Sequence, residues 1–239
     1  MYTITIIILL IISIFYLICD RKYINWYILS LFVIICSCYS YIEFYFCNNF
    51  DMVPAWIFGK NAIIGISIFT IPIEDIFFTP IFAVFFYALY QVFPKERDIA
   101  EKYELALFAL LILLMGLSFF LFSGTFGRYS SIRLFIIITL LSKYCRIKLN
   151  EMIIFCLMII IFAFLWDLWA LNTNQWQYRE FLTGINSNVF NNSKWNWLLI
   201  YHAWFPLEIF FYYLNGSIFG YLILNFLSNY IQEKRKINY

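Results

Sequence analysis

Long apolar stretches dominate this chain and fix the class of fold that it can adopt. Hydrophobic residues make up 64% of the 239 residues, whereas soluble domains average roughly 45–50%. A helix needs about 20 consecutive apolar residues to cross a bilayer. We therefore predict an all-α integral membrane protein with about seven transmembrane helices, placed at residues 3–19, 25–46, 61–93, 105–123, 127–143, 152–170 and 197–229.

The distribution of Lys and Arg predicts how the chain is oriented. One set of predicted loops holds eleven of these residues and the other set holds five. The positive-inside rule places the richer set in the cytoplasm. Asp20-Arg21-Lys22 directly follows the first apolar stretch and no cleavage site does, which indicates a retained helix rather than a signal peptide. We expect a multi-pass protein of the plasma or inner membrane, with its N-terminus outside and its C-terminus cytoplasmic.

One sequence pattern occurs twice, in the same order: an acid near a helix end, a Trp-x-aromatic segment, a glycine and Pro-x-Glu. The first copy is Glu43, Trp56-Ile-Phe58, Gly65 and Pro72-Ile-Glu74. The second copy is Asp167, Trp176-Gln-Tyr178, Gly184 and Pro206-Leu-Glu208. We interpret them as two parallel three-helix repeats at 1–93 and 127–239, joined by a charged loop and a bridging helix at 94–126.

Each copy places a proline and a glutamate inside a long apolar stretch. An ionisable residue in hydrocarbon is costly and indicates a functional site. Proline either kinks a helix or occupies its first turn. We therefore expect the helix either to kink at Pro72 or to restart there, with Glu74 near the positive end of the helix dipole. The structural alternative is that Glu74 and Glu208 only bond nearby backbone or arginine.

The neighbours of the glutamates differ between the two copies. Asp75 lies about 100° around a helix from Glu74, and its counterpart in the second copy is Ile209. Phe78 lies on the Glu74 face, and its counterpart is Tyr212. The aromatic content of 23% either reflects composition alone or supplies walls that bind a conjugated ligand and stabilise a cation.

The segment from Pro72 to Phe78 resembles the Pro-x-Glu-x-x-x-Phe motif of the cofactor-independent lycopene cyclases. These are small membrane proteins of bacteria, archaea and fungi, built as two subunits or as one fused chain. The Trp-aromatic segments and glycines upstream match as well, so the resemblance covers about residues 5–225. The second copy departs from the pattern at Ile209 and Tyr212, and the loop before it is enlarged.

The resemblance implies redox-neutral cyclisation of the ends of a lycopene-like carotenoid to β-ionone rings, with no cofactor or metal. One carboxylic acid protonates a terminal double bond, and a carboxylate later removes a ring proton in a dry pocket. Glu74 and Glu208 would be the acid/base pair, with Asp75 and Asp167 tuning their pKa values or relaying the proton. The implied substrate-binding residues are Phe78, Trp56, Trp176, Tyr212 and Glu43.

Other classes of membrane protein fit the sequence less well or remain open. A retinal protein needs a lysine in its last helix, and residues 197–229 contain none. Asp-rich magnesium-binding loops, Gly-rich nucleotide loops and flavin motifs are also absent from the sequence, and nothing in it indicates nucleic-acid binding. A non-catalytic carotenoid-binding homologue and a small proton-coupled transporter remain as alternatives.

Overall fold

The computed structural model describes residues 2–22, 24–49, 56–58, 63–69, 71–92, 113, 149–173, 175–178, 197–200, 203–206 and 208–237. Five helices make up most of this part: α1 (Tyr2–Cys19), α2 (Trp26–Asn49), α3 (Ile73–Val92), α6 (Leu149–Asn172) and α7 (Glu208–Ile237). The strands are short: β1 (Trp56–Phe58), β2 (Ser67–Ile68), β3 (Ile71–Pro72), β4 (Trp176–Tyr178), β5 (Trp197–Ile200) and β6 (Ala203–Pro206).

The predicted helical class is confirmed for the described residues. α1, α2 and α6 lie where the apolar stretches at 3–19, 25–46 and 152–170 predicted helices. Two helices, Ile73–Val92 and Asn150–Asn172, are long and apolar enough to cross a membrane. The stretches at 105–123 and 127–143 lie almost entirely outside the described residues, so the count of seven spans stays a prediction.

The apolar stretches at 61–93 and 197–229 were each placed as one membrane-spanning segment, and the first parts of both contain strands instead of helix. Each contains an antiparallel hairpin, formed by β2 with β3 and by β5 with β6. The second strand of each hairpin ends at the proline of a Pro-x-Glu motif, and a helix follows almost at once. The helix therefore starts after Pro72 instead of kinking there, because proline donates no backbone hydrogen bond but is compatible with a helix start.

The two Trp-x-aromatic segments pair with each other although they lie far apart in the sequence. β1 and β4 form an antiparallel ribbon in which Trp56 is opposite Tyr178 and Phe58 is opposite Trp176. The middle residues, Ile57 and Gln177, are opposite each other. The ribbon therefore joins the part of the chain before α3 to the part after α6.

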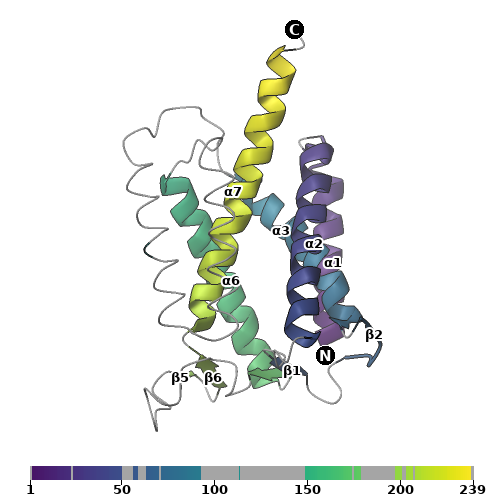
Figure 1. Ribbon diagram of the computed structural model, residues 1–239, viewed down its shortest axis with the longest axis vertical. Coiled ribbons are helices and arrows are strands. Elements are labelled where there is room, and N and C mark those ends of the chain that lie inside the picture. The colour runs from purple at the N-terminus through teal and green to yellow at the C-terminus, as the bar shows by residue number, and fades with distance from the viewer. Residues whose placement is uncertain are drawn as a thin grey trace.

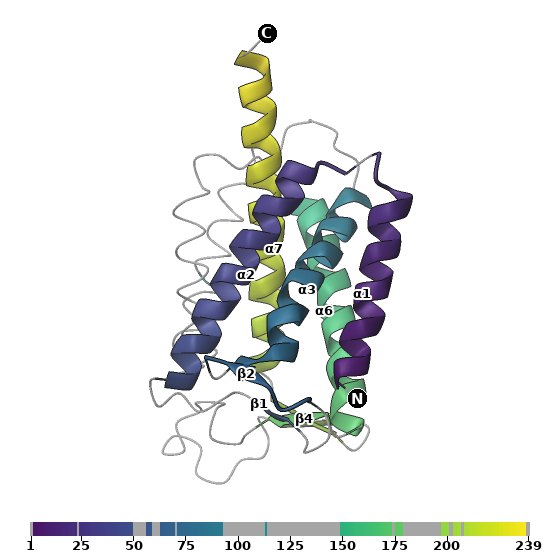
Figure 2. The same ribbon diagram turned by 90° about the vertical axis from the view of Figure 1, so that its right-hand side faces the viewer.

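The helices form a bundle with all the strands at one end (Figures 1 and 2). α2 packs against α3, α6 packs against α7, and α7 also contacts α2 and α3. The largest hydrophobic cluster draws on these four helices and contains the fully buried Phe32, Phe155, Tyr221 and Leu224. α1 packs against α3 at the edge of this bundle (Figure 2).

Two polar contacts fix how α2 sits on α3. Asn25 caps α2, since its Oδ1 accepts a hydrogen bond from the Ile28 N–H at 3.3 Å. The Asn25 N–H in turn donates to the Tyr87 hydroxyl at 3.0 Å. At the other end of the pair, the Tyr41 hydroxyl donates to the carbonyl of Ile76.

The hydrogen bond from Tyr41 satisfies a carbonyl group of α3 that has no donor within its own helix. Pro80 lies inside α3 and has no N–H, so it cannot bond the carbonyl of Ile76 four residues earlier. In hydrocarbon such a freed carbonyl must find another donor. Tyr41 supplies that donor from α2, and the proline is thereby accommodated within the packed helix pair.

Candidate functional site

A cavity of about 240 Å³ lies between α2, α3, α6 and α7. Apolar and aromatic side chains form most of its wall. It is partly open among the described residues. Its lining comprises Phe32, Cys36, Tyr39, Ser40, Asp75, Phe78, Thr79, Phe82, Ala83, Phe86, Ile159, Phe162, Ala163, Trp166, Asp167, Ile209, Tyr212, Tyr213, Gly216, Ser217, Phe219 and Gly220.

In the part of the chain that the structure describes, two carboxyl groups line this cavity, and both are buried. Asp75 is 4% exposed and Asp167 is 6% exposed. Asp75 lies in the first turn of α3 and Asp167 near the C-terminal end of α6, so both belong to the end of the bundle that carries the strands. Burying two ionisable groups in an apolar wall is costly, which marks this end of the cavity as a site for chemistry.

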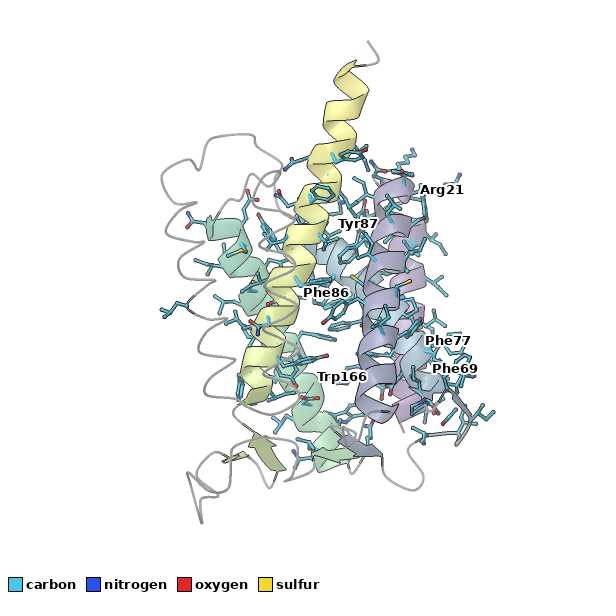
Figure 3. All side chains as sticks on the ribbon, in the orientation of Figure 1. Arg21, Phe69, Phe77, Phe86, Tyr87 and Trp166 are labelled. Atoms are coloured by element: carbon cyan, nitrogen blue, oxygen red, sulfur yellow. The ribbon has the colours of Figure 1, made fainter. Side chains whose placement is uncertain are left out.

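Aromatic rings form a continuous wall beside these carboxyl groups. The Phe78 ring centroid lies 5.1 Å from that of Phe82 and 5.7 Å from that of Trp166. The Phe82 and Phe162 ring centroids are 5.9 Å apart. Figure 3 shows Phe86 and Trp166 lying between the helices. The part of the cavity wall next to Phe78 and Trp166 is therefore largely aromatic.

Matching positions of α3 and α7 line the cavity. Each α3 residue that lines the cavity has a counterpart in α7 that also lines it. The two residues of each pair are as far apart in the sequence as Glu74 and Glu208 are. The pairs are Asp75 with Ile209, Phe78 with Tyr212, Thr79 with Tyr213, Phe82 with Gly216, Ala83 with Ser217 and Phe86 with Gly220.

The same relation holds between α2 and α6. Phe32 pairs with Ile159, Cys36 with Ala163, Tyr39 with Trp166 and Ser40 with Asp167, again at one constant separation. In the cavity, the counterpart of Asp167 is therefore Ser40. The repeated sequence pattern had paired Asp167 with Glu43, three residues after Ser40. Glu43 belongs to α2, and its side chain lies outside the described residues.

Glu74 does not line the cavity. It is 2% exposed, and its Oε1 accepts hydrogen bonds from the Thr3 hydroxyl at 3.2 Å and from the Ile64 N–H. Its Oε2 has no hydrogen-bond partner among the described residues. The Ile64 contact is a bond to nearby backbone, as in the structural alternative. Together the two contacts tie the start of α3 to α1 and to the segment before the hairpin.

The glycine of the first copy, Gly65, lies in the same segment, just before the hairpin that leads into α3. Gly65 has a φ of 87°, a left-handed conformation that side chains with a Cβ disfavour. It lies between Ile64, which donates to Glu74, and Ile66, whose carbonyl accepts from the Ile73 N–H at 3.0 Å. Gly65 and Glu74 together fix the conformation of the segment that leads into α3. The start of α3 in turn determines which way Asp75 faces.

The remaining predicted site residues divide into two groups. Phe78 and Tyr212 line the cavity, and their role in binding a substrate stays a prediction. The backbones of Trp56 and Trp176 belong to the paired strands β1 and β4, and Glu208 begins α7, while all three side chains lie outside the described residues. The predicted pairing of Glu74 with Glu208 therefore stays a prediction.

Some contributors to this site carried no sequence signal. The Thr3 hydroxyl donates to Glu74, and the Thr5 hydroxyl donates to the buried Gln175 at 3.5 Å. The start of α1 is therefore bonded to the start of α3 and to the segment just after α6. In the described part of the chain, no group of three or more His, Cys, Asp or Glu side chains is placed to hold a metal ion.

No protein-family model, no curated protein sequence and no solved structure matches this chain.

Proposed function

We propose that this protein is a membrane carotenoid cyclase that closes the acyclic end of a lycopene-like polyene into a β-ionone ring. The observation that carries the proposal is the cavity, which combines two buried carboxyl groups with an aromatic wall. Acid/base ring closure through a carbocation needs this combination, together with the exclusion of water. No oxidant or reductant is needed, because the reaction is an isomerisation.

The proton balance of the reaction fits a pair of carboxyl groups. The protonated member adds its proton to the terminal double bond and leaves a tertiary cation. The electrons of the next double bond form the ring-closing carbon–carbon bond and move the cation into the ring. The ionised member then removes a proton from the adjacent ring carbon and restores a double bond. One proton is given and one is taken, so its return between the carboxyl groups resets the site.

We assign the two proton transfers to Asp75 and Asp167, because among the described residues these are the carboxyl groups that line the cavity. The rings of Phe78, Phe82 and Trp166 face the developing cation, and each cation–π contact contributes roughly 0.5–2 kcal/mol. Glu74 is then a positioning residue that fixes the start of α3 through Ile64. This assignment differs from the Glu74 and Glu208 pair that the resemblance implied.

The proposal includes the two parallel repeats. Residues at equivalent places in the two halves line the cavity together, and each half has a hairpin that ends at the proline before a helix. The β1–β4 register also supports it, since Ile57 and Gln177 occupy the middle of their segments and face each other. A two-fold axis along the membrane normal, as in a parallel repeat, produces such self-matched antiparallel pairing.

The proposal also keeps the predicted orientation in the plasma or inner membrane, with the N-terminus outside. Figure 1 shows the N-terminus at the strand end of the bundle and the C-terminal end of α7 at the other. Arg21 lies toward the latter end (Figure 3). The basic segment after α1 and the basic end of α7 thus share one side, as the positive-inside rule requires of cytoplasmic segments.

Expression in cells that accumulate lycopene tests the activity, with chromatography of the extracted carotenoids as the readout. The wild type is expected to yield mono- or bicyclic carotene, and Asp75→Asn and Asp167→Asn are each expected to abolish conversion. Asp20→Asn, in the connection after α1, is the matched control and is expected to retain it. Unchanged lycopene alongside folded wild-type protein would reject the cyclase, and lycopene that then copurifies with it would indicate a non-catalytic binder.

Glu74→Gln distinguishes the two assignments of the acid/base pair. Glutamine keeps the oxygen that accepts from Ile64 but has no acidic proton. If Asp75 and Asp167 transfer the protons, Glu74→Gln keeps most of the activity, whereas Glu74→Leu loses it by releasing the start of α3. If Glu74→Gln abolishes conversion while Asp75→Asn does not, the Glu74 and Glu208 pair is the correct one.

A further inference from the structure

We infer that the β2–β3 hairpin is a membrane anchor, which inserts its apolar side chains into the interfacial zone of the lipid bilayer at the strand end of the bundle. The inference rests on the proposed membrane location and does not depend on the cyclase activity. Three features of the hairpin lead to it: the exposure of its side chains, the backbone conformation of Phe69 and its position on the bundle.

The hairpin and the residues just before it present bulky apolar side chains to the surroundings of the protein. Every residue from 64 to 69 is exposed. The exposed fractions of the large apolar residues are 61% for Ile64, 54% for Ile66, 47% for Ile68 and 77% for Phe69. No residue between Lys60 and Glu74 carries a charge. An apolar surface of this kind marks contact with a partner or with a membrane.

The hairpin is attached to the bundle through its second strand. β3 contacts α2 and α3, and Ile71 in this strand is 5% exposed. β2 pairs with β3, and both of its residues are exposed. In the part of the chain that the structure describes, β2 is thus the outer strand of a two-stranded sheet. The backbone groups at such an edge need water or lipid headgroups as hydrogen-bonding partners. The backbone of the hairpin therefore lies at headgroup level, while its side chains reach the acyl chains.

The conformation of Phe69 points to an apolar environment outside the chain. Phe69 has a φ of 49°, in the left-handed region that bulky side chains disfavour. Glycine and asparagine adopt this conformation more readily, yet the position holds a large aromatic residue. Burial within the protein does not offset the cost, because 77% of Phe69 is exposed. Transfer of the ring from water into lipid does favour a phenylalanine there.

The apolar surface of the hairpin continues along the outer side of the bundle, which identifies lipid as its partner. The start of α1 is joined to the start of α3 by the bond from Thr3 to Glu74. The outer face of α1 is apolar, with exposed fractions of 58% for Ile4, 49% for Ile7 and 60% for Ile11. Phe77 on α3 is 56% exposed, and Figure 3 shows Phe69 and Phe77 on the outer side of the bundle toward the strand end. A membrane helix turns such a face to lipid, and the hairpin meets the same lipid.

The anchor fixes the depth of the candidate site in the membrane. Glu74 accepts a hydrogen bond from the Ile64 N–H, so the base of the hairpin is bonded to the first turn of α3. Asp75 follows Pro72 by three residues, or roughly 4.5 Å along a helix. Apolar side chains of interfacial segments reach about 5–10 Å into the boundary between headgroups and acyl chains. Asp75 is therefore held just beneath the headgroups.

Depth-dependent fluorescence quenching tests this placement. A fluorescent amino acid replaces Phe69, Ile11 or Lys22, one at a time, in the full chain, and the protein is reconstituted into vesicles of phosphatidylcholine and phosphatidylglycerol. At position 69, a nitroxide near the headgroup end of the acyl chain is expected to quench several-fold more than iodide present on both sides of the membrane. The label in place of Ile11, on the outer face of α1, should respond most to a nitroxide deep in the bilayer. The label in place of the exposed Lys22, after α1, should respond most to iodide. If position 69 responds like position 22 or like position 11, the inference is wrong.

Photo-crosslinking in the same vesicles separates lipid from a second copy of the chain. A photoreactive phenylalanine analogue in place of Phe69 is expected to give an adduct that adds the mass of one phospholipid. A product of dimer size would show that another copy covers the hairpin and would overturn the inference. So would the absence of a lipid adduct at position 69 when the same analogue in place of Ile11 gives one. Neither measurement uses carotenoid conversion, so failure of the anchor is distinguishable from failure of the proposed function.

Discussion

The hydrogen bond from Tyr41 to Ile76 gives the sharpest test of how the bundle is held together. Tyr41→Phe removes one hydroxyl group and keeps the ring. The carbonyl of Ile76 then loses its donor, because Pro80 has no N–H to replace it. Pro80→Ala restores that N–H within α3. The two substitutions therefore form a cycle in which one residue supplies what the other lacks.

The expected magnitude comes from the cost of an orphaned carbonyl. A buried acceptor left without a partner costs about 1–3 kcal/mol, and interhelical hydrogen bonds in membrane proteins contribute about 0.6 kcal/mol on average and about 1.7 kcal/mol at most. Because Tyr41 and Ile76 are only partly buried, we expect Tyr41→Phe to destabilise the protein by about 1 kcal/mol, within these bounds. In the Pro80→Ala background the same change should cost less than about half of that, since the carbonyl keeps a helical partner.

Thermal unfolding in detergent, followed by circular dichroism, measures the four members of the cycle. For a chain of this size 1 kcal/mol corresponds to a shift of about 2–4 °C in Tm. Tyr27→Phe is the matched control, because Tyr27 lies on the same helix and is 62% exposed. A cycle whose effects add, so that Tyr41→Phe costs the same with and without Pro80, would refute the explanation.

Three further predictions concern stability and use the same measurement. Gly220→Ala should destabilise by about 1–3 kcal/mol, because the new methyl group meets the Phe86 ring, and adding Phe86→Leu should recover part of the loss; no loss in the single variant would show that Phe86 moves freely. Gly65→Ala should cost about 1–2 kcal/mol, because Gly65 has a φ of 87°; a neutral result would mean that the entry into α3 adopts another conformation. Tyr87→Phe should cost about 1 kcal/mol, because the Asn25 N–H loses its acceptor; an unchanged Tm would contradict that role.

Much of the helical framework follows from the sequence because the length of an apolar run is a physical requirement of the bilayer. The hairpins do not follow from it. β2, β3 and β5 consist mainly of Ile, Leu, Ser and Trp, and residues such as Ile and Trp are both apolar and favourable in strands. Hydropathy therefore reads a hairpin and the helix after it as one long apolar stretch. Pro72 was the one local signal of the boundary, and it was compatible with a kink as well as with a start.

The site shows a deeper limit of sequence reasoning. α3 is apolar around most of its circumference, so its periodicity does not say which face turns inward. Repetition favoured Glu74, which has a counterpart in Glu208, over Asp75, whose counterpart is Ile209. In the structure, the repeated residue bonds backbone at the start of its helix, and the unrepeated acid faces the cavity.

This outcome has a physical reason. In both halves a hairpin leads into a helix, and the proline and the glutamate at that turn recur. Under the proposed function, one acid/base site between the two proposed repeats needs only one acid from each, and a second pair would bury two more charges at a cost in stability. Departures from the repeat, such as Asp75 against Ile209 and Asp167 against Ser40, are therefore where the chemistry of a duplicated membrane bundle is expected to lie.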